Sequence, residues 1–317
     1  MTKNPTRKPI SPPTVLDIFL IMLCALIWAS AFVAISIAVK EFDPIMVATS
    51  RVTIGFIFLI SYVLVLPFLA KRTNWPSGRN NWLKLGIIAL LYTAVPFSLI
   101  SWGQQYISAT LTSIIMGSSP LIGYLIAHFA TRDEKLNSMK ILALGLGLVS
   151  IYFATDFSNS TDDTSSIWSI VAILAALVCY SISGTITRTI TNGSTENLSA
   201  AVLGLGTIAL LPALWLTGQY PSDFGSISSD AIWAIIYLGV FPTGLAYLIR
   251  FYLILKIGYT AFLTTIFFIP VFGVLLSAIL LGEPLTINTF YALALIVASL
   301  IISRIGAKMA AKSLQKE

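Results

Sequence analysis

Long apolar runs alternate with short polar or charged connections along the whole of this 317-residue chain. Each run is about 20 residues long, which is the length that a helix needs to cross roughly 30 Å of hydrocarbon. The runs lack the two-residue alternation of a membrane β-barrel, and lipid-exposed backbone must bond within its own helix. We therefore predict an all-α integral membrane protein with ten transmembrane helices, at 17–39, 45–69, 83–101, 106–130, 138–155, 167–189, 198–217, 231–253, 260–281 and 286–304.

The composition supports this fold class. Hydrophobic residues make up 57% of the chain, charged residues only 10%, and the mean hydropathy is +0.89. Soluble domains have about 45–50% apolar and about 25% charged residues, so a soluble globular protein is excluded. Since the spans leave little sequence over, the function must reside within the bundle.

Basic residues follow the alternation of the spans. With the N-terminus in the cytoplasm, seventeen of the nineteen fall on that side, and only Lys40 falls in a loop on the other. The seventeen are Lys3, Arg7, Lys8, Lys71, Arg72, Arg79, Lys84, Arg132, Lys135, Lys140, Arg188, Arg250, Lys256, Arg304, Lys308, Lys312 and Lys316. This distribution predicts a multi-pass protein of the cell (inner or plasma) membrane with both termini cytoplasmic. It also explains the net charge of +6 without a nucleic-acid partner.

The two halves of the chain resemble each other at a separation of about 150 residues. The segment 23–30 aligns with 174–181, Pro120 with Pro270, Glu134 with Glu283, and 143–150 with 292–299. Each half holds five spans, and because five is odd the second half enters the membrane from the opposite side. We predict two inverted five-helix repeats at 17–155 and 167–304, an external linker at 156–166, and cytoplasmic tails at 1–16 and 305–317.

Particular residues in both halves resemble the EamA family of the drug/metabolite transporter superfamily. The second half has Pro270, then Leu281-Gly-Glu-Pro-Leu285 and an Ala-rich last helix; the first has Trp28-Ala-Ser-Ala-Phe-Val33, Asp43-Pro44, Arg51 and Tyr106-Ile-Ser-Ala109. The resemblance covers about 17–304, and it implies ten helices in two EamA units that transport small metabolites, often amino acids and often outward. The first unit departs from the pattern, since it has Thr131-Arg-Asp-Glu134 where the family more often has Gly or Arg before its Glu.

Four prolines within spans predict where the bundle is irregular. Each removes a backbone donor and leaves a carbonyl free, so we expect kinks around a central cavity whose carbonyls face water or solute. Purely structural kinks are the alternative. The four are Pro96, Pro120, Pro242 and Pro270.

The expected cavity lining is aromatic and hydroxylic. We predict that substrate contacts come from Trp28, Ser30, Tyr92, Ser119, Tyr180 and Tyr247 at midplane depth, with Trp102 and Gln105 at the outer mouth. The alternative is a structural role, because hydroxyls of this kind also join helices by hydrogen bonds, and Trp and Tyr rings also form belts at the membrane interfaces. Arg51 is a further candidate, which either snorkels to the interface or helix-end carbonyls, or pairs with a substrate carboxylate.

No Asp or Glu falls near the middle of a span, which disfavours proton-coupled export of cationic drugs. One histidine, His128, and the separated Cys24 and Cys179 predict no metal site, cofactor or disulfide framework. The sequence contains no Gly-rich phosphate-binding loop, so it gives no indication that ATP drives the protein directly.

The leading hypothesis is a secondary transporter rather than an enzyme. It moves a neutral or zwitterionic metabolite, an amino acid or related compound, by alternating access, in export or exchange. The alternatives are a quaternary-amine carrier with an aromatic cage, a channel, and an integral-membrane enzyme acting on lipid head groups. The expected partners are a small-molecule substrate and the lipid bilayer.

Overall fold

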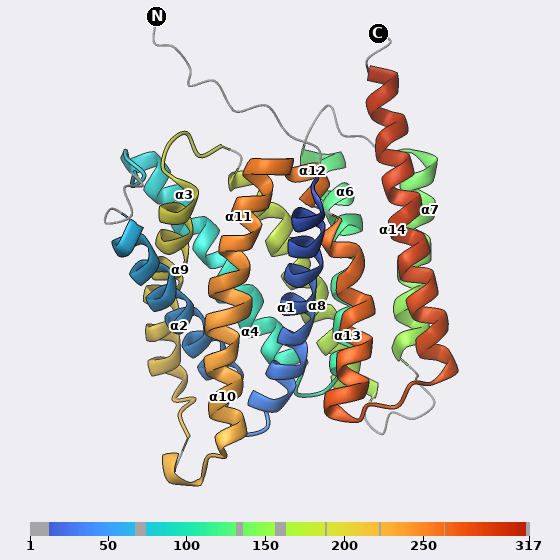
Figure 1. Cartoon of the computed structure of the whole chain (residues 1–317). Helices are drawn as coiled ribbons and strands as arrows, with labels where there is room; N and C mark the ends of the chain where they lie inside the picture. The colour runs from blue at the N-terminus through green and yellow to red at the C-terminus, as the bar shows by residue number, and fades with distance from the viewer. Residues whose placement is uncertain are drawn as a thin grey trace, which may run out of the picture.

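The computed structural model describes residues 13–66, 74–130, 136–155, 163–187, 189–221, 223–262 and 264–314. Throughout these ranges the regular structure is helical, and no strand occurs in them. The helices form a single bundle in which most axes run in roughly the same direction (Figure 1). The all-α prediction is therefore confirmed for the described residues, whereas Glu134 lies outside them.

The helical elements follow the predicted spans closely. In the first half they are α1 (Val15–Ala38), α2 (Pro44–Val65), α3 (Arg79–Ala89), η2 (Leu90–Ala94), α4 (Val95–Gly103), α5 (Ala109–Gly117), α6 (Ser119–Ala130) and α7 (Ser138–Thr155). In the second half they are α8 (Asp163–Thr187), α9 (Thr195–Thr217), η3 (Phe224–Ser226), α10 (Ser229–Leu238), η4 (Gly239–Leu245), α11 (Ala246–Ile257), α12 (Tyr259–Phe262), α13 (Thr265–Leu281) and α14 (Ile287–Leu314).

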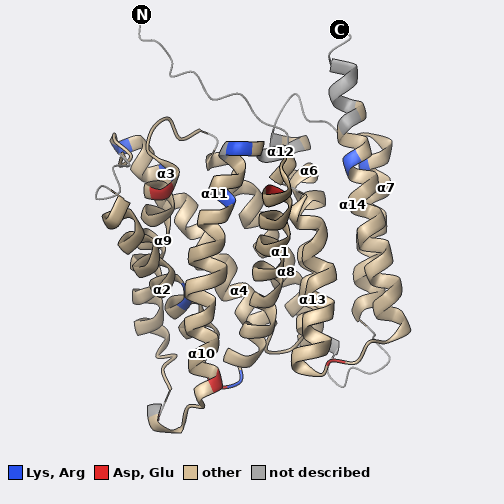
Figure 2. Ribbon diagram, in the orientation of Figure 1, with Lys and Arg blue, Asp and Glu red and all other residues tan. Residues whose placement is uncertain are grey.

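Within the described ranges, nine continuous helical segments are long and apolar enough to cross a membrane. A further apolar helix, α13, has 17 residues, which corresponds to about 26 Å, and α12 precedes it. The start of α1 and the end of α14 lie at the same end of the bundle, called the terminal end below (Figure 1). Lys and Arg gather at the terminal end, and the middle of the bundle is mostly free of charge (Figure 2).

Three spans are less regular than the hydropathy predicts. The fourth is divided at Ser118, whose hydroxyl donates to the Ile115 carbonyl, and Pro120 follows at the start of α6. The third and eighth contain the π-helical segments η2 and η4. Pro96 follows η2 and Pro242 lies within η4, which agrees with the loss of a backbone donor at each proline.

Helices α7 and α14 exchange a reciprocal pair of hydrogen bonds. The Ser150 hydroxyl donates to the Ala292 carbonyl at 2.7 Å, and the Ser299 hydroxyl donates to the Ala143 carbonyl at 2.8 Å. Residue numbers rise along one helix as they fall along the other, so these two helices are antiparallel. In lipid, such polar contacts and close packing hold helices together because burial of apolar surface between them gains little.

Two glycines make a second reciprocal pair of contacts. A Cβ on Gly55 of α2 would collide with the Thr243 side chain in η4, and a Cβ on Gly206 of α9 would collide with the Thr93 side chain in η2. Both threonines are fully buried. Glycine is therefore required at each place for α2 and α9 to approach the two π-helical segments.

A third reciprocal pair joins loops at the two ends of the bundle. At the end opposite the termini, Glu41 accepts hydrogen bonds from the Ser228 backbone N–H at 2.7 Å and from the Ser228 hydroxyl at 2.5 Å. At the terminal end, the Asn192 side-chain oxygen accepts from the Ser77 N–H at 2.8 Å. The contacts are alike, but only Glu41 is titratable.

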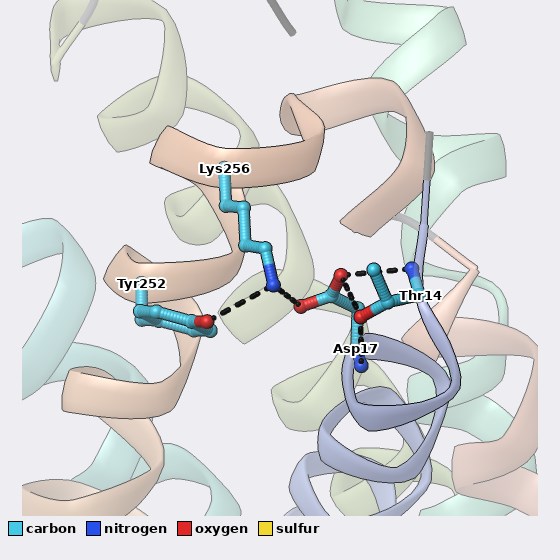
Figure 3. A network of polar contacts seen from close by, with 4 residues as sticks. All are labelled: Thr14, Asp17, Tyr252 and Lys256. Atoms are coloured by element: carbon cyan, nitrogen blue, oxygen red, sulfur yellow. Dashed lines mark hydrogen bonds and ion pairs between the residues drawn. The ribbon is translucent and has the colours of Figure 1, made fainter. Parts of the chain in front are cut away.

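A polar network fixes the first turn of α1 to the end of α11 (Figure 3). Asp17 is fully buried, accepts hydrogen bonds from the Thr14 N–H and hydroxyl, and forms an ion pair with the Lys256 ammonium at 2.8 Å. Lys256 also donates to the Tyr252 hydroxyl at 3.1 Å. One carboxylate thus caps α1 and ties it to α11.

This network predicts coupled losses of stability. Thr14→Ala removes part of the cap and is expected to cost about 1 kcal/mol. Asp17→Asn is expected to lower the thermal midpoint further, because Lys256 then loses its counter-charge. Melting of the purified protein in detergent measures both changes. The double variant with Lys256→Gln should cost less than the sum of the two single losses, and strict additivity would contradict the coupling.

The contact between Glu41 and Ser228 predicts a response to acid at one end only. The hydrogen bonds from Ser228 hold the pKa of the Glu41 carboxyl below its ordinary value near 4.5. A lowered pKa stabilises this contact above pH 4.5, and the stabilisation is lost as the pH falls through the lowered value. Amide exchange at Ser228, corrected for intrinsic rates, should therefore accelerate in acid, while exchange at Ser77 should not. The same acceleration in Glu41→Gln would show that Glu41 is not responsible.

Candidate functional site

A buried arginine lies in the interior of the bundle. Arg51, in the second turn of α2, is 7% exposed. Its Nε donates to the Thr243 hydroxyl at 2.9 Å, and its guanidinium carbon lies 3.9 Å from the centre of the Phe97 ring. No Asp or Glu among the described residues forms an ion pair with it. The snorkelling arrangement is therefore wrong, because the side chain points to η4 and α4 rather than to the interface.

Three tyrosines from three different spans meet in the same region and are called the tyrosine cluster here: Tyr92, Tyr180 and Tyr247. The Tyr92 ring centre lies 5.3 Å from that of Tyr180 and 5.9 Å from that of Tyr247, both at steep angles. Such edge contacts are favourable aromatic geometry. Tyr92 belongs to η2, and Tyr247 is the second residue of α11, which follows η4. One ring of the cluster therefore lies in a π-helical segment and another lies just beyond one.

Three residues that sequence reasoning did not select also belong to this region. Phe97 supplies the face beneath the Arg51 guanidinium, and Thr243 accepts from Arg51 while donating to the Leu238 carbonyl. Arg250 was assigned to the cytoplasmic side on charge alone, but its guanidinium lies 5.7 Å from the Tyr92 ring centre and donates to the Tyr92 hydroxyl at 3.4 Å. Thr243 could have been selected from the sequence, because it follows Thr93 by about 150 residues, which is the separation between the two halves.

Trp28 and Ser30 of α1 contact the eighth span, which contains α10 and η4. The Trp28 indole N–H donates to the Pro242 carbonyl at 3.3 Å, next to Thr243. A carbonyl near the predicted proline irregularity is thus satisfied by a side chain instead of facing an open cavity. Ser30 donates to the Ile27 carbonyl and shares a 2.6 Å hydrogen bond with the Tyr237 hydroxyl.

Other predicted site residues lie apart from the tyrosine cluster. Ser119 is half-buried at the start of α6, and Pro270 packs near Gly117. Trp102 makes an edge contact with Tyr106, with ring centres 5.5 Å apart, near the loop that ends α4. The structure therefore groups Arg51, Tyr92, Tyr180 and Tyr247, places Trp28 beside η4, and separates the rest.

A cavity of about 470 Å³ lies at the end of the bundle opposite the termini. Its lining comes from the end of α1, the connection between α4 and α5, and the connection between α13 and α14: Ser36, Val39, Lys40, Gln104, Gln105, Leu281 and Glu283. Gln105, predicted at an outer mouth, lines this cavity. The volume is within the range of small-molecule sites.

The remaining ionisable candidates have local roles. His128 accepts a hydrogen bond from the Leu136 N–H at 3.2 Å. Cys24 is buried and lies near the Ala246 carbonyl. In the described part of the chain, no group of three metal-ligating side chains converges.

Comparisons with known proteins agree with this architecture. The EamA-like transporter family matches residues 15–155 and 167–305. An uncharacterized transporter, YoaV of Bacillus subtilis, is 22% identical over 84% of this chain and 89% of its own length. Protein PagO of Salmonella typhimurium is 26% identical over 70% of this chain and 71% of its own length.

The likeness extends to three dimensions. A solved crystal structure with 17% sequence identity superposes with a TM-score of 0.65 over 94% of this chain and 99% of its own. At that identity the likeness supports the fold alone. The two family matches cover most of the sequence in two successive units, and the chain is a multi-pass membrane protein that belongs to the EamA-like transporter family.

Proposed function

We propose that this protein is a secondary transporter for a small organic solute that carries a carboxylate and is neutral or zwitterionic overall, an amino acid or a related compound. The solute binds between Arg51 and the tyrosine cluster. Two inverted five-helix repeats, ten spans in all, rock about this site and expose it to each side of the membrane in turn.

The observation that carries the proposal is the buried Arg51 guanidinium without an acidic partner among the described residues. A charged side chain in the interior of a membrane protein is costly unless it is paired. Its hydrogen bond to Thr243 uses Nε. No described residue is seen to accept from the two terminal nitrogens, which could hold a carboxylate in a bidentate manner.

The aromatic surroundings favour a solute with an apolar part. Tyr92, Tyr180, Tyr247 and Phe97 bring rings to the arginine, and tyrosine hydroxyls add polar contacts. A site of this kind combines apolar walls with a few polar anchors. It does not suit a quaternary amine, because Arg51 and Arg250 would repel a second cation.

The reciprocal contacts support the inverted repeats. The pairs Gly55 with Gly206, Thr93 with Thr243, Ser150 with Ser299, and Glu41 with Asn192 all have separations of 149–151 residues. In each case one contact is the counterpart of the other, with the halves exchanged. Two successive family units and antiparallel α7 and α14 agree with a two-fold axis in the membrane plane.

The π-helical segments give the site a means of opening. The rings of the tyrosine cluster contact one another, so a solute enters only if they separate. Tyr92 lies in η2 and Tyr247 lies two residues beyond η4, and π-type turns within helices occur frequently at functional sites. Rearrangement of these two segments would move the rings and preserve the rest of each span.

We expect Arg51→Gln to reduce transport by about tenfold or more, because a charge-assisted hydrogen bond is worth about 1.5–3 kcal/mol. Proteoliposomes loaded with unlabelled amino acid and supplied with the labelled compound measure this exchange. Arg51→Lys should be intermediate, since it keeps the charge and loses the planar donor pair. Tyr180→Ala and Tyr247→Ala should also reduce exchange.

Two matched controls distinguish a binding defect from a folding defect. Arg79→Gln removes an exposed arginine at the terminal end, and Tyr106→Ala removes an exposed tyrosine; neither should change exchange. Wild-type exchange by a well-folded, monodisperse Arg51→Gln variant would overturn the proposed site.

The basic residues at the terminal end predict the sidedness of the bundle. With Cys24 and Cys179 replaced by alanine, a cysteine at Ser226 should react with a membrane-impermeant maleimide on intact cells. A cysteine at Ser77 should react only after the membrane is opened. Labelling of Ser77 from outside, or of both positions from one side, would contradict cytoplasmic termini.

A further inference from the structure

The cavity opposite the termini contains two side chains of opposite charge. Lys40 and Glu283 both line it, yet neither pairs with the other or with another described charged residue. Oppositely charged groups usually pair when they share a small space. Their separation within one cavity of about 470 Å³ therefore leaves room for a molecule that carries both charges.

Glu283 is held in a fixed position. Its two carboxylate oxygens accept the Ala109 N–H at 2.9 Å and the Thr110 N–H at 3.0 Å, at the start of α5. A carboxylate has about four acceptor sites, so about two are still available. Because the backbone already orients the group, it can accept from a solute ammonium with little further ordering.

Gln104 is also oriented by the protein. Its side-chain nitrogen donates to the Phe32 carbonyl and to the Ser36 hydroxyl, both at 2.9 Å. The residue is 5% exposed, and its side-chain oxygen is a buried acceptor that no described donor reaches. Buried acceptors without donors are rare in folded proteins, and a solute N–H can supply the donor here.

Lys40 supplies the positive charge of this cavity on a flexible side chain. It is exposed at the end of α1, and its long stem reaches different positions at little cost. Gln105, which is also exposed, adds an amide near it. The cavity thus has an anionic side that is fixed by backbone bonds and a cationic side that adapts to solutes of different length.

We propose that this cavity is a second solute site, which binds a zwitterion with its carboxylate at Lys40 and its ammonium at Glu283 and Gln104. It rests on the proposed function in one respect: the molecule that it holds is the transported solute, waiting at the end of the bundle opposite the termini. The site differs from the central one because it requires both charges, whereas Arg51 requires only the carboxylate.

Equilibrium binding of tritiated L-phenylalanine to the full chain in nanodiscs tests the proposal. Wild-type protein should bind two molecules per chain. Lys40→Gln should weaken one site by up to about fivefold, since an exposed ion pair is worth up to about 1 kcal/mol, and Lys40→Arg should restore it. Glu283→Gln should weaken the same site while keeping one acceptor for α5. The control Lys84→Gln, at the terminal end, should bind as wild type does.

Competition experiments identify which charged group of the solute, the carboxylate or the ammonium, each site binds. Phenethylamine, which lacks the carboxylate, and 3-phenylpropionate, which lacks the ammonium, should both compete poorly at the site that Lys40 controls. Phenylpropionate should compete at the Arg51 site. Binding of one molecule per chain, or binding that Lys40→Gln and Glu283→Gln leave unchanged, would overturn the second site.

The two proposals fail in different ways. If Arg51→Gln leaves exchange intact while Lys40→Gln weakens one binding step, the central site is wrong and the outer site is upheld. If Arg51→Gln abolishes exchange and Lys40→Gln alters no binding step, the outer site is wrong and the central site is upheld.

Discussion

Every backbone N–H and C=O that lies in hydrocarbon must find a partner within the protein, and this constraint explains both the regular and the irregular parts of the bundle. Where Pro242 interrupts the eighth span, side chains compensate. Thr243 donates to the Leu238 carbonyl, and Trp28 donates to the Pro242 carbonyl. The irregular backbone of the eighth span therefore lies in the interior, beside Arg51, where a polar solute would also be accommodated. The same residues that repair the helices shape the candidate site.

Apolar side chains of the two halves pack against each other, but burial of apolar surface between helices gains little in lipid, so close packing and polar contacts are what join the halves. Gly55 and Gly206 bring helices to the π-helical segments, and Ser150 and Ser299 link α7 with α14. Since each contact occurs twice with the halves exchanged, the joints at the two ends of the bundle have similar geometry. On the proposed function, similar geometry in the two halves would allow two alternative arrangements of comparable energy, as alternating access requires.

Much of the fold could be predicted because hydropathy reports which segments lie in lipid. It does not report backbone geometry. Pro96, Pro120 and Pro242 predicted irregular spans, but not the division at Ser118 or the π-helical form of η2 and η4. The grouping of Tyr92, Tyr180 and Tyr247 followed from rings placed far from either interface. Phe97 and Arg250 were missed for different reasons: a phenylalanine in an apolar span carries no signal, and Arg250 near a span end fitted the charge distribution equally well.

The charge of Arg51, which pairs with no Asp or Glu in the described part of the chain, also constrains the transport cycle on the proposed assignment. Reorientation passes through a state in which the site is closed to water from both sides, and there an uncompensated cation is most costly. A bound carboxylate neutralises that charge, so the loaded protein reorients more readily than the empty one. A carrier with this property exchanges solute across the membrane faster than it returns empty. Such coupling of binding to reorientation needs no buried carboxylate that takes up protons, which agrees with the charge-poor spans of this chain.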